Sequence, residues 1–214
     1  MTLLDGSAQP AQHVLPLLAL TAVLAACGHK EPPAPPYEAN PAPTEAYEVV
    51  VSVQDAPSDI YVSSASVTYK ITNEDCLPPI RNFEGVRYEP ARHSLKIPMQ
   101  RISAGYFKGI YFADGMLERS YYGRSECRWS VQFVGATLRT PASKDYTYFD
   151  VSTYPDASSE TRYALKDIRP WKDDGEIYPA RDWSQWMFDK EVPTANRDDF
   201  FSFTISTRRR NDAQ

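Results

Sequence analysis

The sequence predicts an all-β or mainly β fold with one short helix, arranged as a single antiparallel sandwich or barrel-like domain after a disordered N-terminal segment. Two observations support this fold class. After Tyr47, runs of β-branched and aromatic residues recur at a spacing of roughly 10 to 15 residues, separated by turn-forming residues. The alternation of strands with long helices that a parallel sheet requires is absent.

Each strand is predicted from its own run of residues. The predicted strands are residues 47–53, 64–71, 93–99, 106–113, 116–122, 127–138, 145–154 and 200–207. Pro98 favours an edge position for the third of these, because proline cannot donate a hydrogen bond to a neighbouring strand. Asp114-Gly115 lies between two predicted strands and indicates a tight hairpin there.

Side-chain alternation predicts which residues of three strands face the core. These are Ala65, Val67, Tyr69 and Ile71 in the second strand, Cys127, Trp129, Val131 and Phe133 in the sixth, and Phe201, Phe203 and Ile205 in the last. One helix is predicted near residue 185, with Asp182 as its N-cap and Gln185 as the partner in a capping box. Trp183, Trp186 and Met187 would then lie on one face of that helix.

The apolar run from Leu15 to Cys27 has the length of a signal-peptide hydrophobic region and is short for a membrane-spanning helix, which needs about 20 residues. Its end, Leu24-Ala25-Ala26-Cys27, resembles a bacterial lipobox. The resemblance implies that residues 1–26 are removed as a signal peptide and that Cys27 is lipidated on sulfur and on its new amino group. Gly28 in place of aspartate implies the periplasmic face of the outer membrane. Residues 1–14 contain no Lys or Arg, which departs from the positively charged start of most signal peptides.

Residues 27–46 are predicted to be a tether, followed by a β-rich globular domain at residues 47–210. Six of the 18 prolines fall in residues 28–46, and no hydrophobic period is present. Proline-rich segments favour an extended polyproline conformation, so this tether would reach at most about 60 Å.

With Cys27 assigned to lipid, Cys76 and Cys127 remain as a pair. The periplasm is oxidising, so we expect a disulfide between them, with two buried free thiols as the alternative. The bond would close a loop of about 50 residues and stabilise the fold by roughly 4 kcal/mol.

Charge and composition argue against several function classes. The net charge of −5 becomes −4 when residues 1–26 leave with Asp5, their only charged residue, which does not favour nucleic-acid binding. Of the three histidines only His93 lies in the predicted domain, and no hydrolase, phosphate-loop or zinc motif is present. The sequence therefore predicts no enzyme activity, no cofactor and no metal.

Aromatic residues make up 13% of the chain, and exposed Tyr and Trp rings suit protein recognition. The candidate partner-binding residues are Tyr121, Tyr122, Trp171, Asp173, Asp174, Glu176, Trp183 and Trp186. The alternative is that the tryptophans belong to the core.

The whole plan resembles the lipoprotein immunity proteins that protect bacteria from secreted toxins: a lipobox, a Pro-rich tether and a small β domain with a disulfide. The resemblance implies a membrane-anchored periplasmic protein that binds and neutralises a toxin. The alternatives are a structural or assembly lipoprotein that binds an envelope or secretion complex, and a periplasmic enzyme or small-ligand binder.

Overall fold

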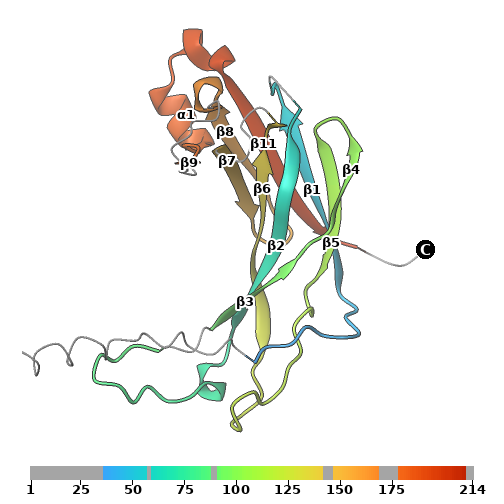
Figure 1. The fold of residues 1–214 in the computed structure, drawn as a ribbon, viewed down its shortest axis with the longest axis vertical. Helices are drawn as coiled ribbons and strands as arrows, with labels where there is room; N and C mark the ends of the chain where they lie inside the picture. The colour runs from blue at the N-terminus through green and yellow to red at the C-terminus, as the bar shows by residue number, and fades with distance from the viewer. Residues whose placement is uncertain (1–35, 57–58, 88–90, 142–146, 169–177, 211–214) are drawn as a thin grey trace, which may run out of the picture. The chain divides into compact units, whose positions relative to one another are not determined.

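The computed structural model describes residues 36–56, 59–87, 91–141, 147–168 and 178–210, all of which lie in the unit Pro35–Gln214. These residues form two β-sheets with short helical segments (Figure 1). The predicted mainly β, antiparallel fold is confirmed.

The larger sheet has six strands in the order β10-β8-β11-β1-β5-β4. Their bounds are β1 Ala46–Gln54, β4 Met99–Ser103, β5 Tyr106–Phe112, β8 Ser158–Ala164, β10 Trp183–Ser184 and β11 Phe200–Arg209. All its neighbouring strands are antiparallel. The first and last long strands of the domain, β1 and β11, therefore lie side by side.

The second sheet has five strands in the order β3-β2-β6-β7-β9. Their bounds are β2 Tyr61–Ile71, β3 Arg92–Lys96, β6 Trp129–Arg139, β7 Thr147–Thr153 and β9 Tyr178–Pro179. The β7–β9 pair is parallel, and the other pairs are antiparallel. The helical segments are α1 Gln185–Glu191 and the 3₁₀ turns Glu74–Cys76, Leu165–Asp167 and Thr194–Asp199.

The core lies between the two sheets. The inward residues predicted for β2 and β11 are buried: Ala65, Val67, Tyr69, Ile71, Phe201, Phe203 and Ile205. Phe149 of β7 meets Tyr163 of β8 and Phe201 of β11 at ring-centroid distances of 5.0 and 5.3 Å, with edge-on geometry. The Tyr163 hydroxyl donates to the carbonyl of Asp150, so its polar end is satisfied inside the core.

The predicted core face of β6 is correct in its first half and wrong in its second half. The pairing with β2 advances from Thr68↔Phe133 to Tyr69↔Val131, so Gln132 is an extra residue in a β-bulge. A bulge shifts the alternation of side chains by one position. Trp129 and Val131 pack against the core, whereas Phe133 points outward and Val134 takes the buried place.

Three other predictions of local structure differ from the fold. Residues 93–99 form two strands, β3 and β4, which belong to different sheets and are separated at Ile97-Pro98. Residues 116–122 form no strand and make two isolated bridges, from Met116 to Ala39 and from Arg119 to Cys127. Strand β8 was not predicted, because most of its residues are polar and its buried side chains, Tyr163 and Ala164, come only at its end.

The Cys76–Cys127 disulfide is present, as predicted, with the two Cα atoms 5.2 Å apart. Both cysteines are fully buried. The bond joins the 3₁₀ turn after β2 to the start of β6. Asn73 reinforces this junction, because its side chain donates to the carbonyl of Glu126 and accepts from the amide of Arg128.

Residues 36–45, which the sequence places in the tether, make contacts with the folded unit. Tyr37 is only 8% exposed. Its ring packs edge-on against Trp129, Tyr121 and Tyr122, with the Trp129 ring centroid 4.8 Å away. The amide of Leu117 donates to the carbonyl of Glu38. Ring packing around Tyr37 and a backbone hydrogen bond thus hold a segment whose composition predicts an extended tether.

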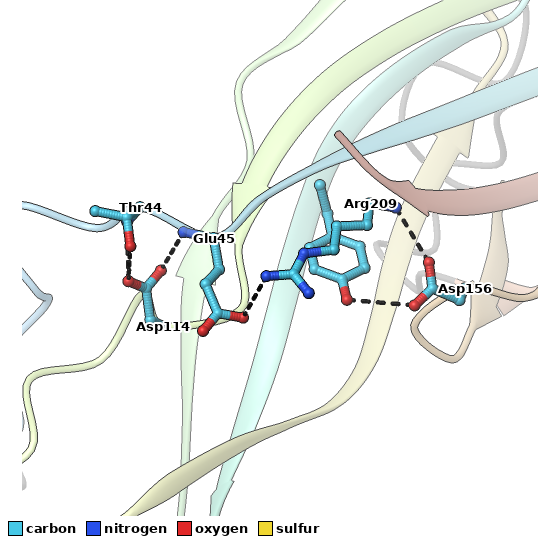
Figure 2. A network of polar contacts seen from close by, with 6 residues as sticks. Thr44, Glu45, Asp114, Asp156 and Arg209 are labelled. Atoms are coloured by element: carbon cyan, nitrogen blue, oxygen red, sulfur yellow. Dashed lines mark hydrogen bonds and ion pairs between the residues drawn. The ribbon is translucent and has the colours of Figure 1, made fainter. Parts of the chain in front are cut away.

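Asp114, just after β5, holds the part of the N-terminal segment that immediately precedes β1. Its carboxylate accepts hydrogen bonds from the amide and hydroxyl of Thr44 and from the amide of Glu45 (Figure 2). Burial alone would raise the pKa of Asp114, but these hydrogen bonds lower the pKa below its usual value. A Cβ at Gly115 would collide with the Tyr69 hydroxyl. Asp114-Gly115 is therefore a docking point for the N-terminal segment, and the predicted hairpin is wrong.

A second part of this network ties β1 to β11 and to the turn before β8. Arg209 pairs with Glu45 at 3.5 Å, and its backbone amide donates to Asp156 at 3.1 Å (Figure 2). The Tyr47 hydroxyl donates to the same carboxylate at 3.2 Å. These polar contacts hold together the start of β1, the end of β11 and the turn before β8.

The Asp114 contacts predict a measurable loss on substitution. Asp114→Ala removes the acceptor of two amides and a hydroxyl, and we expect the free energy of unfolding to fall by about 1–2 kcal/mol. Chemical denaturation measures this change. Asp198→Ala, at an exposed aspartate without a partner in the described residues, is the control and should change stability by less than about 0.5 kcal/mol. Equal effects of the two substitutions would contradict the role assigned to Asp114.

Candidate functional site

The candidate site is the surface around α1, which we call the α1 surface and define by Arg181, Trp183, Trp186, Lys190 and the pocket beside Phe200. It combines exposed and half-buried aromatic rings with cations. Helix α1 itself lies at one end of the two sheets (Figure 1). Strand β10 leads directly into α1 and pairs with β8, so this surface rests on the six-stranded sheet.

Ser184 begins the helix, not the predicted cap Asp182. The Ser184 hydroxyl accepts a hydrogen bond from the amide of Met187 at 3.4 Å, the usual geometry of an N-cap. Trp183 precedes the helix as part of β10, where its backbone pairs with Arg162. Phe188, which is 5% exposed, is the buried residue of the helix, whereas Trp186 is 67% exposed. The predicted shared face of Trp183, Trp186 and Met187 is therefore wrong.

Edge-on contacts among three aromatic rings, which we call the ring ladder, support the α1 surface. Trp183 meets Phe200 edge-on at 5.7 Å between centroids, and Phe200 meets Phe188 edge-on at 5.1 Å. Phe200 is the first residue of β11, so the ladder continues from α1 into the six-stranded sheet. This packing holds Trp183 in place while part of its ring stays accessible.

Cations lie over these rings. Arg181 lies 4.1 Å from the Trp183 ring centroid, and Lys190 lies 4.6 Å from that of Trp186. Arg162 and Arg197 lie 4.7 and 5.1 Å from the Phe188 ring. Such contacts contribute about 0.5–1 kcal/mol each at exposed sites, and they restrict how the indoles move.

A pocket of about 480 Å³ lies beside the ring ladder. Trp183 and Phe200 form its aromatic wall, and Lys166, Glu191 and Asp199 place charges at its border. The volume is within the usual range of pockets that accept a side chain or a small ligand. Residues 180–199 carry five carboxylates and three basic side chains, and Arg162 and Lys166 add two more cations, so the charges of the surface balance.

The predicted partner-binding residues fall into separate places. Trp183 and Trp186 lie on the α1 surface. Trp171, Asp173, Asp174 and Glu176 lie outside the described residues, as does Cys27. The sequence did not identify Phe188, Phe200 or the four cations as site residues, because no local pattern places them together.

Tyr121 and Tyr122 lie at the opposite end of the sheets and are partly buried against Tyr37. The Tyr122 hydroxyl donates to that of Tyr37 at 3.2 Å, and the Tyr121 hydroxyl donates to the carbonyl of Leu117. Burial raises the pKa of Tyr121 above its ordinary value. These contacts give both tyrosines a role in holding the N-terminal segment.

His93 belongs to the same end, with its ring 5.9 Å from that of Tyr37. Burial lowers the pKa of His93, because the charged imidazolium loses hydration there. Within the described ranges, no group of three or more His, Cys, Asp or Glu side chains is arranged to hold a metal ion. In the same part of the chain, no helix is long and apolar enough to cross a membrane.

No protein family, curated protein or solved structure matches this chain.

The two faces of α1 should respond differently to substitution. Phe188→Ala removes a buried ring and should lower the free energy of unfolding by about 3–4 kcal/mol. Trp186→Ala should cost less than about 1 kcal/mol, because two-thirds of that side chain is already in water. Thermal or chemical unfolding measures both. A loss of more than about 2 kcal/mol for Trp186→Ala would show that its ring is structural and would remove it from the site.

His93 predicts a pH dependence of stability. Because folding lowers the pKa of His93, the unfolded chain binds the proton more readily. The free energy of unfolding should therefore be greatest above about pH 6.5, the usual histidine value, and fall as pH decreases below it. Unfolding measured between about pH 7.5 and 5.5, above the range of most carboxylates, checks this. His93→Gln should flatten the profile in that window; an unchanged slope would contradict the assignment.

Proposed function

We propose that this chain is a lipid-anchored periplasmic protein that binds and neutralises a partner protein, in the manner of an immunity protein against a secreted antibacterial toxin. The observation that carries the proposal is the α1 surface, where Trp186 is 67% exposed and Trp183 is held at a pocket. Exposed indoles on a rigid support provide large contact area at low entropic cost, which is typical of protein-binding hot spots.

The charges at the pocket support a partner that brings basic groups to it. Glu191 and Asp199 border the pocket, and Lys166 is the one cation in its described lining. An aromatic wall with two carboxylates at its border complements basic groups on a partner, and opposite charges accelerate association. Neutralisation would follow from covering such groups.

Two further observations support the proposed compartment. The lipobox-like run ends at Cys27, and the disulfide between the remaining cysteines is typical of proteins that fold in an oxidising environment. The protein would then act on the periplasmic face of the outer membrane, where an incoming toxin meets its target.

A growth competition tests the proposed function. A strain that lacks this protein is mixed with its parent, and survival is counted. We expect the deletion strain to be killed and to be rescued by the wild-type gene, with rescue reduced at least about tenfold by the Trp183→Ala,Trp186→Ala double variant, equivalent to about 1.4 kcal/mol of lost binding.

Tyr154→Ala is the matched control for this experiment, because Tyr154 is 69% exposed and lies outside the α1 surface. It should rescue as well as wild type. The immunity role fails if the deletion strain survives contact with its parent. If the strain instead shows envelope defects, an assembly role in an envelope or secretion complex takes its place.

A further inference from the structure

The loop between the first 3₁₀ turn and β3 exposes three apolar side chains to water. We call residues 77–87 the apolar loop. Phe83 at its tip is fully exposed, and Ile80 and Val86 are about half exposed. Single apolar residues are common on protein surfaces, whereas exposed apolar side chains gathered in one place mark an interaction site, and these three lie within seven residues of one loop.

Hydrogen bonds shape the tip of the apolar loop. The side chain of Asn82 accepts from the amide of Val86 and donates to its carbonyl, closing a tight turn around Phe83. Gly85 has a φ of +67°, a conformation that favours glycine. Because these hydrogen bonds already order the turn, Phe83 would lose little conformational entropy on binding to another surface.

The base of the loop is equally well held. Leu77 is buried next to the Cys76–Cys127 disulfide. Arg87 donates to the carbonyl of Pro78 and lies 3.8 Å from the Glu74 carboxylate. Contacts at both its tip and its base therefore hold the apolar loop in place.

The N-terminal segment enters the fold at the same end as the apolar loop. Tyr37 contacts His93, which lies just after the loop on β3, and Trp129, whose backbone pairs with Ile71 just before it. In Figure 1 the segment that begins at residue 36 and the loop after β2 both lie at the end of the sheets opposite α1. Only eight residues separate Cys27 from Pro36, which limits the span to about 28 Å.

Exposed cations border the apolar loop. Arg81 lies within it, and Lys70 and Arg92 are cross-strand neighbours on β2 and β3 at its base. None of the three pairs with a carboxylate among the described residues. The exposed carboxylate Glu84 follows Phe83 in the loop, but these three cations outnumber it. Apolar side chains with a net positive border match the layered chemistry of a bilayer surface, with acyl chains beneath anionic headgroups.

We propose that the apolar loop inserts into the periplasmic leaflet of the outer membrane as a second membrane contact beside the lipidated Cys27. This inference rests on the lipid anchor of the proposed function. The short span from Cys27 keeps this end of the domain near the membrane, so Phe83, Ile80 and Val86 reach the acyl region and Arg81, Lys70 and Arg92 meet phosphate groups. The α1 surface then faces away from the bilayer, toward an incoming partner.

A single-thiol label tests the contact in the full lipidated protein. With Cys27 acylated and the other two cysteines bonded to each other, Phe83→Cys introduces the only free thiol. An environment-sensitive fluorophore on that thiol is examined in phosphatidylethanolamine–phosphatidylglycerol vesicles carrying the protein. Trp186→Cys on α1 is the matched control, and Val86→Cys is a second position on the loop.

We expect blue-shifted emission and at least about threefold greater quenching by lipid-borne nitroxides at residues 83 and 86 than at residue 186. A lipidated chain whose label at residue 83 stays in water overturns the loop contact alone. A mature chain whose mass shows no lipid removes the anchor, and with it both proposals. Energy transfer between labels at residue 83 that grows with protein concentration would assign the loop to contact between two copies and overturn the membrane contact.

Discussion

The layer of aromatic rings between the two sheets is the interaction on which the rest of the structure depends. Phe149 comes from one sheet, and Tyr163, Phe201 and Phe203 come from the other; all four are essentially inaccessible to water. Their ring centroids lie 5.0 to 6.1 Å apart, with edge-on or tilted geometry. Large rings bury much apolar area, so this layer contributes most to holding the sheets face to face. It also fixes β8 and β11, which carry β10 and the ring ladder beneath α1.

The two ends of the sheets have different chemistry. At one end, Tyr37 and Asp114 dock the N-terminal segment, and the apolar loop projects next to it. At the other end, α1 presents Trp186 and Trp183 beside a pocket. Strand β1 follows the docked segment and pairs with β11, whose first residue Phe200 packs against Phe188 of α1, so one six-stranded sheet connects the two ends. Under the proposed function, the lipid anchor would join the domain at one end and the partner would bind at the other.

Local pattern was a good guide wherever a strand keeps an unbroken alternation. Strands β2 and β11 bury the residues that their alternation indicates. The pattern misled at Phe133, because one extra residue at Gln132 reverses the faces of β6, and nothing in the surrounding sequence marks that bulge. It misled again at α1, where tertiary contact with Phe200 selected Phe188 as the buried residue. Asp114-Gly115 has the sequence of a hairpin turn, but the Asp114 carboxylate accepts hydrogen bonds from residues about 70 positions earlier in the chain.

The sequence by itself determined the fold class, the strands with regular alternation and the pairing of Cys76 with Cys127. These depend on composition, on a two-residue period and on the number of cysteines, which are local or countable properties. Only the tertiary structure decided that Tyr37 belongs to the core, that Tyr121 and Tyr122 serve to hold it, and that the apolar loop lies beside the point where the N-terminal segment enters. These outcomes depend on contacts between residues tens of positions apart, for which no spacing rule exists, because the sheets alone determine which distant segments meet.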